Sequence, residues 1–80
     1  MKVSVIEELV KTASVQRLIE AEMALVNEKP SPLEVEGRDE GEKLTHILAA
    51  IWIREFMEST STDFQTALRE YTQQVRETMN

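Results

Sequence analysis

The chain has 80 residues and no cysteine, and 41% of its residues are hydrophobic and 30% charged. This length predicts a single domain over residues 1–80, and the lack of cysteine excludes disulfide bridges, thiolate metal sites and a thiol nucleophile. Fifteen acidic side chains and nine Lys and Arg give a net charge of −6, which argues against nucleic acid and anionic membranes as partners.

Neither the start of the chain nor its most apolar run has the pattern of a targeting or membrane segment. Glu7 and Glu8 interrupt the apolar residues near the N-terminus, so we expect no signal peptide. Residues 47–53 are all apolar, but a helix needs about 20 such residues to span a bilayer. We therefore expect a soluble, cytoplasmic protein.

Two short amphipathic helices are expected before the first proline. Apolar residues recur at helical spacing over residues 3–13 and again over residues 15–26. In one continuous helix over residues 3–26, the apolar side would swing by about 160° near Ser14. This predicts a break at residues 12–14, with Ser14 as the N-cap of the second helix. A continuous helix that buries opposite faces against two partners is the alternative.

A proline-rich turn follows the second helix. Pro30 and Pro32 prevent the helix from continuing and favour an extended path. Residues 33–36 alternate between apolar and acidic, which predicts an extended segment that directs Leu33 and Val35 inward. The segment is too short to form a sheet on its own.

A long, unusually apolar third helix is expected over residues 40–58. Asp39 and Glu42 match the reciprocal capping pattern at its start. Apolar side chains cover roughly 260° of its circumference, and a helix that is apolar nearly all round must be surrounded by other protein. Because three short amphipathic neighbours offer little cover, this helix predicts self-association.

A fourth helix is expected after the polar residues 59–63, with Ser61 or Thr62 at its start. Its apolar residues are spaced by three and four, a narrow seam of the kind used in helix pairing. The seam consists of Phe64, Leu68, Tyr71, Val75 and Met79. The four segments together predict an all-α fold, a small bundle of three to four helices that is completed by oligomerisation.

The leading functional hypothesis is a protein that acts by association with itself, as a homodimer or higher oligomer. The expected interface residues are Ile47, Ile51, Trp52, Ile53 and Phe56 in the third helix and Phe64, Leu68, Tyr71 and Val75 in the fourth. A related hypothesis is a binding module whose apolar side receives a helix of another protein.

Two carboxylates interrupt apolar sides. Glu22 lies at the centre of the apolar side of the second helix, where an unpaired carboxylate is costly and needs a cation, a metal ion or water. A position near an edge or groove and a structural salt bridge are both compatible with this placement. Glu55 interrupts the apolar arc of the third helix near its end and is expected to protrude past the packed region.

The alternative functional hypothesis is a metal-binding bundle that uses Glu22, Glu42 and His46. A Glu and a His four residues apart on one helix can bind the same metal ion, and His46 is the only histidine. The spacing is not that of zinc peptidases or of di-iron bundles. Helix capping by Asp39 and Glu42 explains the acidic residues at this helix start equally well.

No set of residues predicts catalysis or a bound cofactor. The acidic residues 34–42 do not fit a calcium loop, because Pro32 and Lys43 would occupy positions that require acids. Gly37 and Gly41 are not followed by the Lys and Ser or Thr of a phosphate-binding loop. With one histidine, no arrangement of nucleophile, base and acid is visible, so we do not expect an enzyme.

Overall fold

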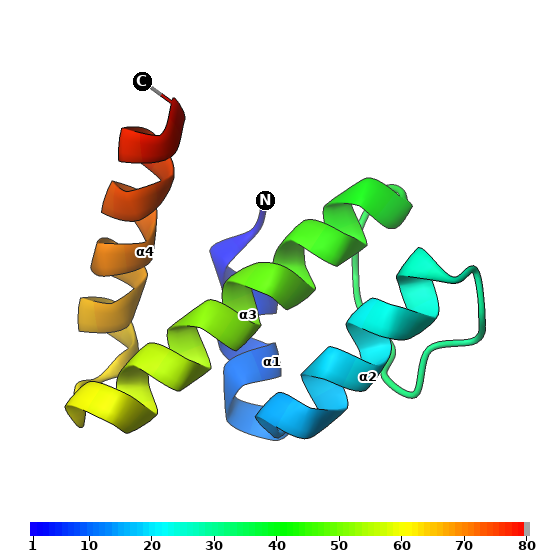
Figure 1. Cartoon of the computed structure of the whole chain (residues 1–80), viewed down its shortest axis with the longest axis horizontal. Helices are drawn as coiled ribbons and strands as arrows, with labels where there is room; N and C mark the ends of the chain where they lie inside the picture. The colour runs from blue at the N-terminus through cyan, green and yellow to red at the C-terminus, as the bar shows by residue number, and fades with distance from the viewer. Residues whose placement is uncertain (80) are drawn as a thin grey trace.

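The computed structural model describes the backbone of residues 1–79 and the side chains of residues 1–76 (Figure 1). Four α-helices follow one another along the chain: α1 (Val3–Thr12), α2 (Val15–Val26), α3 (Glu40–Thr60) and α4 (Phe64–Met79). No strand occurs among the described residues. The predicted all-α helical bundle is therefore confirmed.

The break between α1 and α2 lies where the sequence predicts it. Ala13 is extended (φ −123°, ψ 141°) and ends α1. The Ser14 hydroxyl accepts a hydrogen bond from the N–H of Arg17 at 3.2 Å and so caps α2. The alternative of one continuous helix is wrong, because only the break allows both apolar sides to face the same neighbour.

The start of α3 is capped nearly as expected. The Asp39 carboxylate accepts a hydrogen bond from the N–H of Glu42 at 2.8 Å. In return, the Glu42 carboxylate accepts one from the N–H of Arg38 at 2.9 Å, one residue before the donor of the standard reciprocal pattern. The helix that holds most of the apolar residues therefore has a fixed beginning.

The start of α4 differs from the prediction by one to two residues. Ser61 adopts the left-handed conformation (φ 55°) that ends α3, and Thr62 lies in the turn. Asp63 provides the cap instead, because its carboxylate accepts a hydrogen bond from the N–H of Thr66 at 2.9 Å. Hydrogen bonds from Thr66, chiefly from its side chain, lower the pKa of Asp63.

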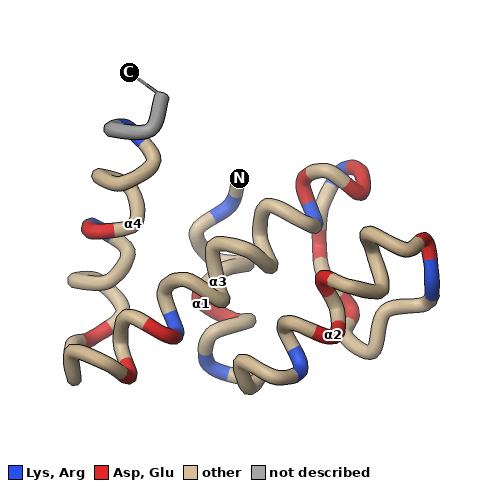
Figure 2. Tube along the Cα trace, in the orientation of Figure 1, with Lys and Arg blue, Asp and Glu red and all other residues tan. Residues whose placement is uncertain are grey.

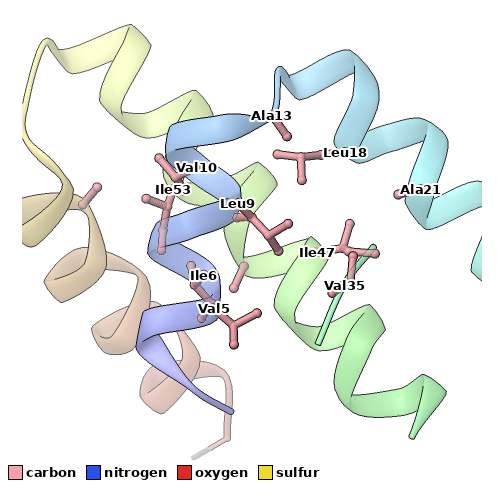
Figure 3. Close-up of a cluster of buried hydrophobic side chains, with 13 residues drawn as sticks. Val5, Ile6, Leu9, Val10, Ala13, Leu18, Ala21, Val35, Ile47 and Ile53 are labelled. Atoms are coloured by element: carbon pink, nitrogen blue, oxygen red, sulfur yellow. The ribbon is translucent and has the colours of Figure 1, made fainter. Parts of the chain in front are cut away.

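α3 is the central helix of the fold. α1, α2 and α4 each pack against it: α2 runs antiparallel beside it, and α1 lies behind it in Figure 1. Figure 3 shows side chains from α1, α2 and α3 converging on one core. The largest side chains with no exposed surface are Ile6, Leu18, Ile47 and Ile53 of this core, together with His46.

Ile47 and Ile53, two of the residues expected at a subunit interface, belong to this core. Both have no exposed surface in the single chain, so they form part of its own core. The three neighbouring helices cover more of α3 than their lengths suggested, because buried alanines let them approach closely. Ala49 and Ala50 of α3 and Ala21 of α2 are all fully buried.

The connector between α2 and α3 also contributes to the core. Val35 is buried, and Leu33 is half-buried against the same cluster, as the alternation predicts. The Arg17 guanidinium donates a hydrogen bond to the carbonyl oxygen of Pro32 at 3.0 Å and ties the connector to α2.

Within the described part of the chain, no helix combines the length and apolar character needed to cross a bilayer.

Candidate functional site

His46 is the one fully buried polar side chain among the described residues. Its Nδ1 lies 2.8 Å from the carbonyl oxygen of Glu36, and its Nε2 lies 3.0 Å from the backbone nitrogen of Lys2. Because the Lys2 N–H can only donate, Nε2 must carry a lone pair and Nδ1 the proton. The imidazole is therefore neutral, and it joins the start of α1, the connector and α3.

Glu42, one turn before His46, is also occupied by contacts within the chain. Its carboxylate lies 3.5 Å from the α-ammonium group of Met1 and 3.5 Å from Nε of Arg38. The hydrogen bond from the Arg38 N–H is the main cause that lowers the pKa of Glu42. Glu42 thus anchors the N-terminus of the chain to the start of α3.

The structure does not bring the three candidate metal ligands together. Among the described residues, no group of three His, Asp or Glu side chains is placed to hold a metal ion. The lone pair of His46 that a metal would need already accepts the Lys2 N–H. Glu22 lies half-buried on α2, and no ion pair involves it within residues 1–76.

An open cavity of about 760 Å³ lies beside His46, between the connector and the start of α3. Its charged lining is mixed, with Lys2, Arg38 and Lys43 facing Glu34, Glu36 and Glu42. No buried side-chain nitrogen or oxygen among the described residues lacks a hydrogen-bond partner. The cavity therefore offers no buried unpaired group that would point to a ligand.

Three of the expected interface residues form an aromatic junction between α3 and α4. The rings of Trp52 and Phe56 are stacked with centroids 5.2 Å apart, and Tyr71 is tilted against Trp52 at 5.6 Å. These three side chains are half-buried, as are Ile51, Phe64 and Leu68, and all six pack against the core. Burial raises the pKa of Tyr71. α3 and α4 thus pair within one chain.

Val75 is the member of the expected interface that remains most exposed, at 38%. Met79, the last residue of the expected α4 seam, lies outside the described side chains. Glu55 is exposed, as expected from its place near the end of α3.

Besides Val75, the structure exposes a set of apolar residues that was not expected from the sequence. Met23 and Val26 of α2 are 56% and 63% exposed, and Leu48 of α3 is 46% exposed. The signal was present in α2, whose apolar residues spread over a wider arc than one neighbouring helix can cover. Sequence position alone could not show which part of that arc faces α3.

No curated protein and no solved structure matches the chain. A family of unknown function, DUF6952, matches it over residues 1–80. Because that match covers all 80 residues of the chain, the protein belongs to this family.

Proposed function

We propose that this protein acts through protein–protein association and that it assembles with itself along α4. The surface in question is the α4 seam, whose described side chains are Phe64, Leu68, Tyr71 and Val75. The first three of these residues pack against the chain's own core, whereas Val75 continues the same stripe with 38% of its surface exposed. This open end of the seam carries the proposal.

The way α4 leaves the body of the fold supports this proposal. α4 packs extensively against α3 alone among the described helices, and its C-terminal half stands away from the other helices in Figure 1. The accessible surface is 5490 Å², whereas a compact monomer of 9.2 kDa is expected to expose about 4900 Å². An extra partner along α4 would reduce that excess.

The charges of α4 are compatible with pairing between two copies. The sequence of α4 contains Arg69 and Arg76 together with Glu70 and Glu77, so the charges of the helix sum to zero. Two copies of α4 in antiparallel contact would therefore meet without net repulsion.

Sedimentation velocity over a concentration series tests the proposal. We expect the wild type to have a mass above 9.2 kDa at high micromolar concentration. Val75→Glu, which places a charge in the open seam, should weaken self-association at least about tenfold. Gln73→Glu adds the same charge to an exposed position about 160° away on the helix and should leave it unchanged. A monomeric wild type, or equal effects of the two variants, would refute self-assembly through α4.

A further inference from the structure

A second exposed apolar surface, on α2 and α3, lies apart from the α4 seam. This α2–α3 face is built from Ile19, Met23 and Val26 of α2 and Leu44, Leu48 and Ile51 of α3. Its three most open members, Met23, Val26 and Leu48, are 56%, 63% and 46% exposed, and the other three are half-buried. Several exposed apolar side chains on neighbouring helices are less common on a monomer than single ones and point to an interaction site.

The register of the two helices places these residues on one side of the molecule. Leu18 and Ile47 are buried and mark the core-facing side of each helix. A helix turns by about 100° per residue, so on each helix the residues of the α2–α3 face lie roughly 40–140° around the axis from the buried residue. Seen from the N-terminus of each helix, the direction of this rotation is the same. Because α2 and α3 run antiparallel (Figure 1), rotation in the same direction places both sets of residues on the same side of the helix pair. α1 lies on the opposite side of α3.

The charges on this side of the two helices are all negative. Glu22 is half-buried among the apolar residues of α2, and Glu40 and Glu55 are exposed one turn before and one turn after the α3 part of the face.

The three cations of these helices point elsewhere. Arg17 donates to the Pro32 carbonyl, and Arg54 donates to the carbonyls of Val10 and Ala13 at the end of α1. Lys43 lines the cavity beside the connector.

The exposed apolar side chains and the carboxylates around them together indicate the kind of partner that the face binds. We infer that the α2–α3 face binds an amphipathic helix of another protein, whose apolar stripe is flanked by Lys and Arg. The stripe packs against the apolar side chains of the face, and the flanking cations pair with Glu22, Glu40 and Glu55. A second copy of this chain fits poorly, because face-to-face packing would bring two sets of the same carboxylates together.

The inference concerns a different surface from the α4 seam, so the two can be tested separately on the full chain. The probe is a synthetic helical peptide of about 18 residues, with Leu spaced by three and four and Lys on both flanks. Its control keeps the Leu stripe and replaces every Lys with Glu. We expect calorimetry to show that the chain binds the Lys peptide at least about tenfold more tightly than the Glu peptide.

Three variants locate the binding. Leu48→Lys, at an exposed position, should weaken binding of the Lys peptide at least about tenfold, and Glu22→Gln should weaken it several-fold. Val75→Glu, in the α4 seam, should leave peptide binding unchanged even where it alters the sedimentation mass. Circular dichroism checks that each variant keeps its helices.

Four outcomes would overturn the inference. They are equal affinity for the two peptides, no binding of the Lys peptide at millimolar concentration, and unchanged binding by Leu48→Lys. The fourth is a loss of self-association in Leu48→Lys, which would assign the face to a second copy.

Discussion

The α4 seam and the α2–α3 face both leave apolar side chains exposed, yet they differ in the charges around them. Along α4, Arg69 and Arg76 are balanced by Glu70 and Glu77. Within the α2–α3 face and along its border the charged groups are Glu22, Glu40 and Glu55. We propose both as interaction surfaces, and the surrounding charges favour a copy of the same chain at the seam and a different, basic partner at the α2–α3 face.

The net charge of the whole chain conceals this difference. Residues 17–43 hold eight acidic and four basic side chains, a net charge of −4 out of the total of −6. Figure 2 shows these residues on α2, the connector and the start of α3, away from α4. The acidic character that argues against nucleic acid is thus concentrated in one half of the molecule.

Core and surface residues of α3 should differ most in their contribution to stability. Ile53→Ala should lower the free energy of unfolding by about 2–5 kcal/mol, because it opens a cavity in the core. Leu48→Ala should lower it by less than about 1 kcal/mol, because that side chain is 46% exposed. Urea unfolding at low protein concentration measures both. If Leu48→Ala were as destabilising as Ile53→Ala, the α2–α3 face would be part of the core and not a docking surface.

A second variant tests what holds the acid-rich half together. His46→Ala removes the partner of the Lys2 N–H and of the Glu36 carbonyl oxygen, both of which lie against α3. Loss of these hydrogen bonds should lower the free energy of unfolding by about 2–4 kcal/mol. Thr45→Ala, at the exposed neighbouring position, is the control and should change it by less than about 0.5 kcal/mol. A small effect of His46→Ala in chemical denaturation would contradict the structural role of the ring.

The features that the sequence predicts correctly depend on neighbours along the chain. The break at Ser14 and the cap at Asp39 follow from local hydrogen-bonding preferences and from the phase of the apolar residues. The misplaced start of α4 is also local: three candidate caps follow one another, and the turn at Ser61 is used to end α3.

The features that the sequence could not provide depend on contacts between distant segments. Ile47 and Leu48 are adjacent and equally apolar, yet the first has no exposed surface and the second is 46% exposed. Which of them is covered depends on where α1, α2 and α4 meet α3. In the same way, nothing near His46 in the sequence indicates that its partner is the N–H of Lys2. The metal hypothesis arose from that missing information.

Salt should affect the two surfaces differently. Raising NaCl from about 0.1 M to about 1 M shortens the Debye length from about 10 Å to about 3 Å. We expect binding of the Lys peptide to the α2–α3 face to weaken several-fold, because it depends on Glu22, Glu40 and Glu55. Self-association through the charge-balanced α4 seam should stay constant or strengthen slightly. Calorimetry and sedimentation under the same two conditions check this, and equal salt dependence would contradict the contrast between the surfaces.

The smallest effect concerns acid, since each half of the molecule contains one carboxylate whose pKa is lowered by hydrogen bonds. Arg38 lowers the pKa of Glu42 in the acid-rich half, and Thr66 lowers that of Asp63 at the start of α4. A lowered pKa in the folded state means that the ionised form stabilises the fold above the ordinary pKa of the group. That contribution is lost as the pH falls below about 4.

Thermal unfolding at pH 7 and at pH 3 measures these two contributions. We expect Asp63→Asn and Glu42→Gln each to lower the melting temperature slightly at pH 7 and to differ less from the wild type at pH 3. Glu40→Gln, which changes the same charge at an exposed position of α3, should show no such pH dependence. If Asp63→Asn had the same effect on the melting temperature at both pH values, the Asp63 side chain would act only as a hydrogen-bonding helix cap, independently of its charge. The ionised form would then contribute nothing at the start of α4, and the charge-based contrast between the two halves would rest on Glu42 alone.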